Sequence, residues 1–255
     1  MFVLNTRLLL LLPLLTFSVD LFAANIDEYR IYLDQDNRSK KFRVANESNV
    51  VEKCKLDFSY QQYKAGGVPV SGASEDLQKQ LSEPALSRLR YSPKNFTIEP
   101  KKSQYITFSL RRKVNDPANE FRTYLMVKCV KQEEIKAEVD VISLTPQLIY
   151  NIPLIMRTGK LSGGVEFKNI EKDVKKGLSF ELHLKGERSV YGDAFLLDVL
   201  TGEEYSKRRG FAVYPESGYR RLTFPLNNKN AEKKLRLVFK ERDRYGGNSE
   251  YSIEF

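Results

Sequence analysis

The sequence is poor in the residues that most catalytic and metal sites require. Its 255 residues include one histidine and two cysteines, so no cluster of histidine, cysteine and aspartate has the spacing of metal ligands. The single histidine, His183, lies in the alternating stretch FELHLKG, with no acid or nucleophile at a matching spacing. We therefore expect no metal, no cofactor and no enzymatic activity. A secreted hydrolase stays open as an alternative, because the paired carboxylates of a glycosidase converge only in the folded chain.

The chain also lacks long hydrophobic runs, with one exception at its start. Arg7 precedes an apolar run at residues 8–19, and small residues follow within residues 21–24. This pattern is typical of a cleaved secretory signal peptide, here residues 1–24, with an uncleaved anchor as the alternative. No later segment approaches the roughly 18 apolar residues of a membrane span. We expect an exported chain that begins near Asn25 and has no stable membrane insertion.

Positive charge is in excess, with 42 lysines and arginines against 33 aspartates and glutamates. The positive residues are scattered in pairs and short runs, at residues 101–102, 111–113, 207–209 and 220–221. Scattered pairs without a recognised nucleic-acid module do not indicate nucleic-acid binding. The excess is compatible with a solvated basic surface, and otherwise favours an acidic protein partner or a membrane surface.

Short alternating stretches dominate the first half of the chain, among them EYRIYLDQ, SQYITFSLRR and FRTYLMVKCVK. Alternating polar and apolar residues between turn residues predict strands. Residues 75–90 are an exception, because leucine spacing and Pro84 indicate short helical turns or an irregular connection. About seven short strands in roughly 130 residues predict a β-sandwich.

The character of the sequence changes at residues 158–164, TGKLSGG, which read as a flexible linker. A second series of short strand-like stretches follows, from GVEFKNIEKD to YSIEF. We therefore predict an all-β protein with one domain at residues 25–157 and a β-sandwich domain at residues 158–255.

The stretch at residues 140–157, DVISLTPQLIYNIPLIMR, is long, extended and almost uncharged. Residues two apart on a strand share one face, which predicts an apolar row. Pro146 falls on the same parity and favours an edge strand. The stretch is either a buried sandwich strand or an edge kept open for pairing with another chain. The row consists of Ile142, Leu144, Leu148, Tyr150 and Ile152.

The two cysteines, Cys54 and Cys129, both lie in strand-like stretches. An even number of cysteines in an exported chain suggests one disulfide. The alternative is two buried free thiols that behave as small hydrophobic side chains.

In the stretch RYSPKNFTIEPKKSQYITFSLRR, Ser92-Pro93 precedes an apolar strand, and a proline-containing turn leads to a second strand. This order resembles the signature region of the periplasmic pilus chaperones of the chaperone–usher pathway, and the chain is similar to a divergent branch of that family. EYRIYLD, NEFRTYLMVKCV, YNIPLIMRTG and, in the second half, GERSVYGD and RRGFAVYPESGYRRLTFPL also resemble that family. The resemblance covers nearly the whole chain after the leader.

The resemblance implies two immunoglobulin-like β-sandwich domains arranged as a boomerang. It implies a periplasmic chaperone that donates its last first-domain strand to an incomplete pilus subunit and passes the subunit to an outer-membrane usher. Ile142, Leu144 and Leu148 would fill the subunit's groove, and Arg30 would bind the subunit's terminal carboxylate.

The same resemblance implies roles for other residues. Arg157 would pair with Glu120 and orient the two domains, while Cys54 and Cys129 would lie on neighbouring antiparallel strands. One position departs from the family pattern, because Pro153 stands where a lysine would help to hold the carboxylate. The unloaded protein could cover its open strand by self-association. A secreted adhesion or carbohydrate-binding sandwich protein is the alternative function.

Overall fold

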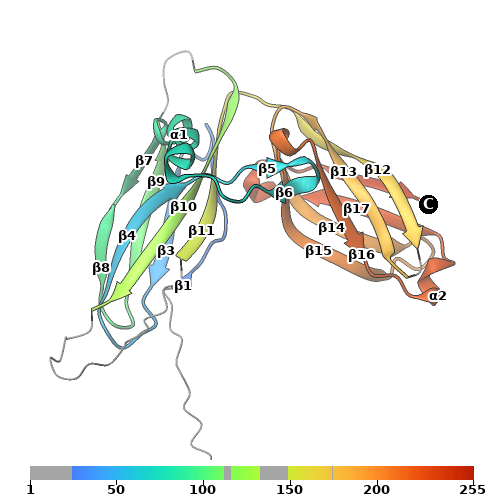
Figure 1. The fold of residues 1–255 in the computed structure, drawn as a ribbon, viewed down its shortest axis with the longest axis horizontal. Helices are drawn as coiled ribbons and strands as arrows, with labels where there is room; N and C mark the ends of the chain where they lie inside the picture. The colour runs from blue at the N-terminus through green and yellow to red at the C-terminus, as the bar shows by residue number, and fades with distance from the viewer. Residues whose placement is uncertain (1–24, 112–115, 133–148, 174) are drawn as a thin grey trace, which may run out of the picture.

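A computed structural model describes residues 25–111, 116–132, 149–173 and 175–255 of the chain. Strands dominate the structure and form two β-sandwiches set at an angle to one another (Figure 1). The expected all-β fold with two sandwiches in a boomerang arrangement is therefore confirmed. Among the residues described, no helix has the length and apolar character to cross a membrane.

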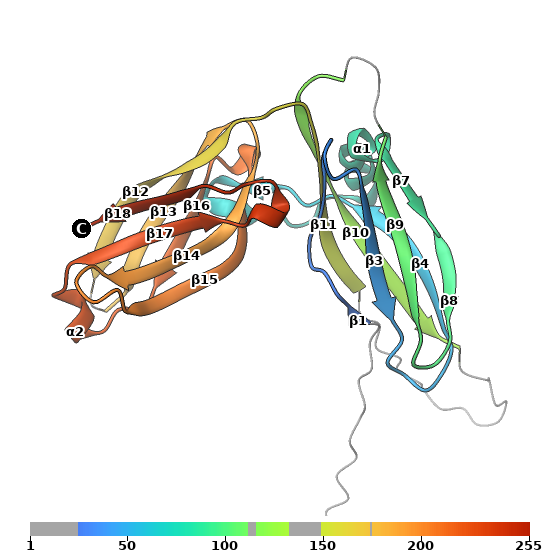
Figure 2. The ribbon, with the colours of Figure 1, turned by 180° about the vertical axis from the view of Figure 1, so that it is seen from behind.

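The first sandwich packs a four-stranded sheet, in the order β1-β3-β9-β7, on a five-stranded sheet, in the order β2-β11-β10-β4-β8. Neighbouring strands are antiparallel except β2 and β11, which are parallel. Figure 2 shows β3 and β9 side by side. The strands are β1 (Asn25–Ile26), β2 (Ile31–Leu33), β3 (Ser39–Ala45), β4 (Glu52–Ser59), β7 (Leu89–Ser92), β8 (Asn95–Ile98), β9 (Ser103–Leu110), β10 (Asn119–Lys131) and β11 (Ile149–Thr158).

Alternation along these strands produces the first core. On β9, Ile106, Phe108 and Leu110 point inward and are buried, while the residues between them are more exposed. Phe42 of β3 meets Phe108 edge to face, with 6.2 Å between ring centroids. Each fully buried side chain of this size contributes about 1.5–3 kcal/mol, so the period-two pattern largely determines which face of each strand is packed.

The segment around Pro84 forms one continuous helix, α1 (Glu75–Leu86), rather than the expected short turns or irregular connection. Ser74 caps its start, because the Ser74 hydroxyl accepts a hydrogen bond from the Leu77 amide at 3.3 Å. Pro84 lies near the end of the helix, which ends two residues later at Leu86. The buried Ser82 hydroxyl donates to the Ser59 carbonyl at 2.9 Å and so attaches the helix to β4.

The second sandwich packs a three-stranded sheet, in the order β12-β13-β16, on a four-stranded sheet, in the order β15-β14-β17-β18. All of its neighbouring strands are antiparallel. Its elements are β12 (Gly163–Asp173), β13 (Gly177–Gly186), β14 (Val190–Asp198), β15 (Glu204–Val213), η2 (Pro215–Ser217), β16 (Tyr219–Phe224), α2 (Asn228–Ala231), β17 (Leu235–Glu241), η3 (Asp243–Tyr245) and β18 (Glu250–Glu254).

The two sandwiches have separate cores, and two segments of the chain cross between them. The main chain passes between them after β11 ends at Thr158 and before β12 begins at Gly163, so the predicted boundary after Arg157 falls at the end of β11. A hairpin also extends from the first sandwich to the second (Figure 1). At the second sandwich, Arg220 Nη1 donates to the Gly67 carbonyl at 3.2 Å. The hairpin consists of β5 (Tyr63–Lys64), η1 (Ala65–Gly67) and β6 (Val68–Pro69).

Candidate binding site between the two sandwiches

Strand β11 has an incompletely paired edge on the side of the first sandwich that faces the second (Figure 1). It pairs with β10 from Ile149 to Thr158, but with β2 only from Leu154 to Met156. Among the described residues, its first five residues therefore have a partner strand on one side only. Ile149 is 44% exposed there, whereas Ile152 is buried in the core.

The apolar row predicted for residues 140–157 is only partly within the described structure. Tyr150 is half-buried and Ile152 is buried, so this end of the row belongs to the sandwich core. Ile142, Leu144, Leu148 and Pro146 lie outside the described residues. Their role in subunit binding stays a prediction.

Arg30 lies immediately before β2 and is 2% exposed. Its guanidinium carbon lies 4.3 Å from the ring centroid of Tyr191, and its Nη1 is 3.4 Å from the Tyr214 hydroxyl. Both tyrosines belong to the second sandwich. Nε of Arg30 is buried and has no hydrogen-bond partner among the described residues. The predicted subunit-binding arginine is therefore buried against the second sandwich, not at an open surface.

Arg30 lines a cavity of about 340 Å³ that both sandwiches enclose. Pro153 of β11 is also in the wall, so the departure from the family pattern occurs at the cavity itself. Burial raises the pKa of Tyr191, which keeps this part of the wall uncharged at neutral pH. The remaining charged lining comes from the second sandwich and is entirely basic: Arg208, Arg209 and Arg220.

Arg157 and Glu120 form the ion pair predicted from the sequence, with 2.7 Å between Arg157 Nε and Glu120 Oε2. The pair also contacts the second sandwich. Arg157 Nη1 donates to the Gly246 carbonyl at 2.9 Å and Nη2 to the Ser189 carbonyl at 2.8 Å. Glu120 Oε1 accepts from the Ser189 amide at 3.1 Å. These contacts bring both residues to the junction, while their orienting role stays a prediction.

A third arginine at the junction, Arg122, was not predicted from the sequence. Its guanidinium carbon lies 3.8 Å from the centroid of the Tyr214 ring, and its amino groups bind Glu216 of the second sandwich. Arg122 Nη2 also donates to the Tyr60 hydroxyl at 3.2 Å. Glu216 is 94 residues away in sequence, and no local motif signals such a pair.

Burial by itself would lower the pKa of Arg122, but Tyr214 and the hydrogen bond to Glu216 outweigh burial and raise it. Arg122 is therefore a permanent cation within a group of tyrosine rings. Near the other pair, burial raises the pKa of Tyr32 to about 12, so its hydroxyl stays neutral beside Arg157.

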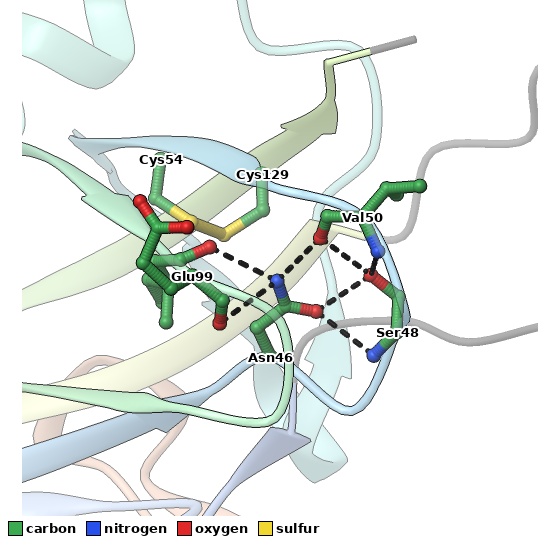
Figure 3. Close-up of a disulfide and its surroundings, with 7 residues drawn as sticks. Asn46, Ser48, Val50, Cys54, Glu99 and Cys129 are labelled. Carbon is green, nitrogen blue, oxygen red and sulfur yellow. Dashed lines mark hydrogen bonds between the residues drawn. A yellow bond between two sulfur atoms is a disulfide. The ribbon is translucent and has the colours of Figure 1, made fainter.

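Cys54 and Cys129 form a disulfide across neighbouring antiparallel strands β4 and β10, as predicted (Figure 3). They are directly opposite in the register, with Cα atoms 4.1 Å apart. Glu52 is buried close by, and its Oε2 has no hydrogen-bond partner within the part of the chain that the structure describes. Burial is the main reason that the pKa of Glu52 is raised above its usual value.

Near the disulfide, Asn46 holds two loops together (Figure 3). Its side-chain amide donates to the Val50 carbonyl at 2.7 Å and to the Ile98 carbonyl at 3.0 Å. Its carbonyl oxygen accepts from the amide and the hydroxyl of Ser48. A buried asparagine that is satisfied in this way fixes the loop before β4, which positions Cys54.

Two further groups bear on the expectation of no metal site and no catalysis. Glu52, Cys54 and Cys129 have ligand atoms within 4.8 Å of one another, but both sulfur atoms are already used in the disulfide.

His183 Nε2 is 2.8 Å from Glu181 Oε2, and its ring stacks on Tyr219. The pKa of Glu181 falls to about 2, because of its hydrogen bonds with Arg221 and then His183. The imidazole of His183 therefore has both a hydrogen-bond partner and a stacking partner within the second sandwich.

No family model matches the chain, and no curated protein matches it. Solved structures do match. The structure of the Salmonella enterica SafA pilin in complex with the SafB chaperone aligns with a TM-score of 0.50 and 13% identity, over 93% of this chain and 98% of that chain. This chain shares that fold.

Two other solved structures are similar over most of their length. The E. coli chaperone DraB aligns with a TM-score of 0.49 and 14% identity, over 92% of this chain and 96% of that chain. The Pseudomonas aeruginosa CupB2 chaperone aligns with a TM-score of 0.47 and 12% identity, over 90% of this chain and 98% of that chain.

Proposed function

We propose that this protein is a periplasmic chaperone that binds pilus or fimbrial subunits by donating a strand to them and delivers them to an outer-membrane usher. The observation that carries the proposal is the edge of β11, which has no partner strand beside residues 149–153 in the described chain. In the sequence, residues 141–148 directly before this edge contain no charged side chain. The fold shared with the SafA–SafB structure supports the proposal.

In this mechanism the donated strand supplies main-chain hydrogen bonds to the subunit, and alternate side chains enter the subunit's groove. Ile142, Leu144 and Leu148 are the side chains that enter it. Burying three such side chains contributes on the order of 5–8 kcal/mol before the cost of ordering the strand. A subunit that lacks a strand would otherwise expose this apolar groove to water.

The location and the partners belong to the same proposal. The protein reaches the periplasm through a signal peptide at residues 1–24, and its disulfide suits that oxidising compartment. It acts by binding and carries out no chemical step. Without a subunit, the open edge is covered by a second copy of the chain. Glu120 and Arg157 keep the two sandwiches at the angle that leaves the cleft accessible.

Co-expression with candidate pilins tests the donated strand. Leu144→Glu and Leu148→Glu place a charge on the proposed row, whereas Ser143→Glu places the same charge on the opposite parity and serves as the matched control. We expect all three variants to fold, and only the first two to lose co-purification with pilin. If Leu144→Glu and Leu148→Glu misfold, the row is ordinary core, because a buried unpaired carboxylate prevents packing. Folded variants that still capture pilin would exclude this strand as the site.

A further inference from the structure

Two basic runs of the second sandwich, residues 207–209 and 220–221, come together in the folded chain. The first run lies on β15, the edge strand of the four-stranded sheet, and the second lies on β16, the edge strand of the three-stranded sheet. Both strands line a cavity of about 350 Å³ between these two edges. We call the cations of the two runs the basic seam: Lys207, Arg208, Arg209, Arg220 and Arg221.

Three cations of the basic seam have no acidic partner. Among the described residues, Arg208, Arg209 and Arg220 form no ion pair with a carboxylate. Arg220 donates instead to the Gly67 carbonyl, which has no formal charge. The described residues that line the cavity between β15 and β16 include no aspartate and no glutamate. The positive potential of the seam is therefore available to an anion from outside the chain.

The other two cations are paired but still face the solvent. Lys207 Nζ lies 2.7 Å from Glu204 Oε1, and both side chains of this pair are exposed. Arg221 pairs with the buried Glu181, while the Arg221 side chain itself remains 61% exposed. Exposed ion pairs contribute little to stability, so both cations remain accessible to a further anion.

The backbone of β15 explains why three successive cations are exposed. Side chains of a regular strand alternate between its two faces. At Arg209 and Gly210, however, β15 has two residues where β14 has only Asp193, which is a β-bulge. Gly210 has a φ of 66°, which suits glycine, and its amide donates to Asp193 at 2.7 Å. Next to this bulge, residues 207–209 are all exposed.

The same features argue against an extended polypeptide as the ligand of the seam. A bulged edge strand that carries successive positive charges is a poor template for pairing with another strand. The seam instead suits compact anionic groups that need no backbone pairing. Guanidinium groups bind phosphate oxygens through two parallel hydrogen bonds.

We propose that the basic seam holds the second sandwich against an anionic membrane surface by binding the phosphate groups of lipid headgroups. This role goes beyond the proposed chaperone function. Five cations spread over two strands match a surface with many phosphate groups, and lysine and arginine are attracted to such a surface within about one Debye length. The open edge of β11 belongs to the first sandwich and is not part of the seam.

The test uses vesicles of defined composition and protein purified from the periplasm. The probe is a phosphatidylcholine vesicle with about 30% phosphatidylglycerol, and pure phosphatidylcholine vesicles are the uncharged match. We expect the protein to co-sediment with the anionic vesicles about tenfold more strongly at low salt. The difference should disappear at about 0.5 M salt. Equal co-sedimentation with both vesicles would overturn the proposal, because the cations would then only solvate and protect the strand edges.

Two soluble probes distinguish other anions from a membrane. One is inorganic phosphate, and the other is a peptide of aspartate and glutamate. Binding of inorganic phosphate without binding of anionic vesicles would identify a soluble phosphate as the ligand and overturn the lipid assignment. Binding of the acidic peptide without binding of the vesicles would overturn it in favour of an acidic protein partner.

Variants then assign the residues. Arg208→Gln/Arg209→Gln removes two exposed cations, so this variant should fold and lose the tenfold preference. Arg208→Lys/Arg209→Lys keeps both charges and should retain most of the binding. Lys53→Gln/Lys55→Gln removes two exposed cations of β4 in the first sandwich and is the matched control, which should bind as the wild type does. Equal losses in the two glutamine variants, or no loss in either, would overturn the role of the seam.

The lipid proposal and the chaperone function fail separately, because capture of pilin is measured in solution without vesicles. If the wild type captures pilin but does not prefer anionic vesicles, the chaperone function stands and the lipid proposal is wrong. If the wild type prefers anionic vesicles but captures no pilin, the lipid proposal stands and the chaperone function is wrong.

Discussion

Arg157 and Glu120 pair across β11 and β10, and together they bind four backbone groups of the second sandwich. Arg157 Nε lies 2.7 Å from Glu120 Oε2, and the two residues are directly opposite in the antiparallel register. The remaining donors and acceptors of the pair contact Ser189, Tyr245 and Gly246. This ion pair lies within the first sandwich, and its hydrogen bonds to backbone groups of the second sandwich also help to join the two sandwiches.

Arg157→Ala should lower the free energy of unfolding by about 3–5 kcal/mol, because it leaves Glu120 buried without its partner. The relative orientation of the sandwiches should also become variable, which small-angle scattering measures as a larger radius of gyration. Arg236→Ala is the matched control, since it removes an exposed partner of Glu254 and should cost about 1 kcal/mol or less. An unchanged scattering profile for Arg157→Ala would exclude an orienting role.

Arg30→Met should leave the stability of the unloaded protein unchanged or raise it by about 1 kcal/mol, because it removes a buried charge that has no carboxylate partner. The same variant should lose capture of pilin. In Arg188→Met, the buried Glu241 keeps its charge and loses its partner, so this control should lose about 3–5 kcal/mol. Thermal unfolding compares the two. A large destabilisation of Arg30→Met would show that Arg30 supports the fold.

Replacing both Cys54 and Cys129 by alanine should cost about 4 kcal/mol, since the disulfide closes a loop with a sequence separation of 75. Urea unfolding with and without reductant measures this loss. The reduced wild type should match the double variant, and the double variant should not respond to reductant. Mass spectrometry of the unreduced protein should find the two cysteine peptides linked, and free thiols at both positions would contradict the structure.

Glu52→Gln should make the protein more stable at pH 7 but not at pH 4. Burial raises the pKa of Glu52 in the folded state above its unfolded value. The unfolded state therefore releases this proton at a lower pH, and the wild type loses stability as pH rises from the ordinary value of the carboxyl through the raised one. Melting temperatures across pH 4–8 measure the effect. Asp57→Asn, at a carboxyl whose pKa is lowered, is the control and should show the opposite trend.

Several features could be predicted from the sequence because they depend on local pattern. Period-two alternation in SQYITFSL determines which face of β9 is buried, and in the structure Ile106, Phe108 and Leu110 are inside. The sequence has two cysteines, which allow one intramolecular pairing, and that pair is bonded. Pro84 was misleading, because a proline in the last turn removes one hydrogen bond there but leaves the preceding turns of the helix intact, and α1 ends at Leu86, two residues after it.

Sequence alone thus determined the strands, their inward faces and the two-sandwich fold, because each depends on neighbouring residues and on the burial of apolar side chains. Which residues line the cleft between the sandwiches depends on the tertiary structure. Arg30 and Arg220 are far apart in the sequence, and only the angle between the sandwiches brings them to one cavity. The same holds for Arg122 and Glu216. Whether a buried arginine has a carboxylate partner depends on which carboxylates fold against it, and no local pattern encodes that.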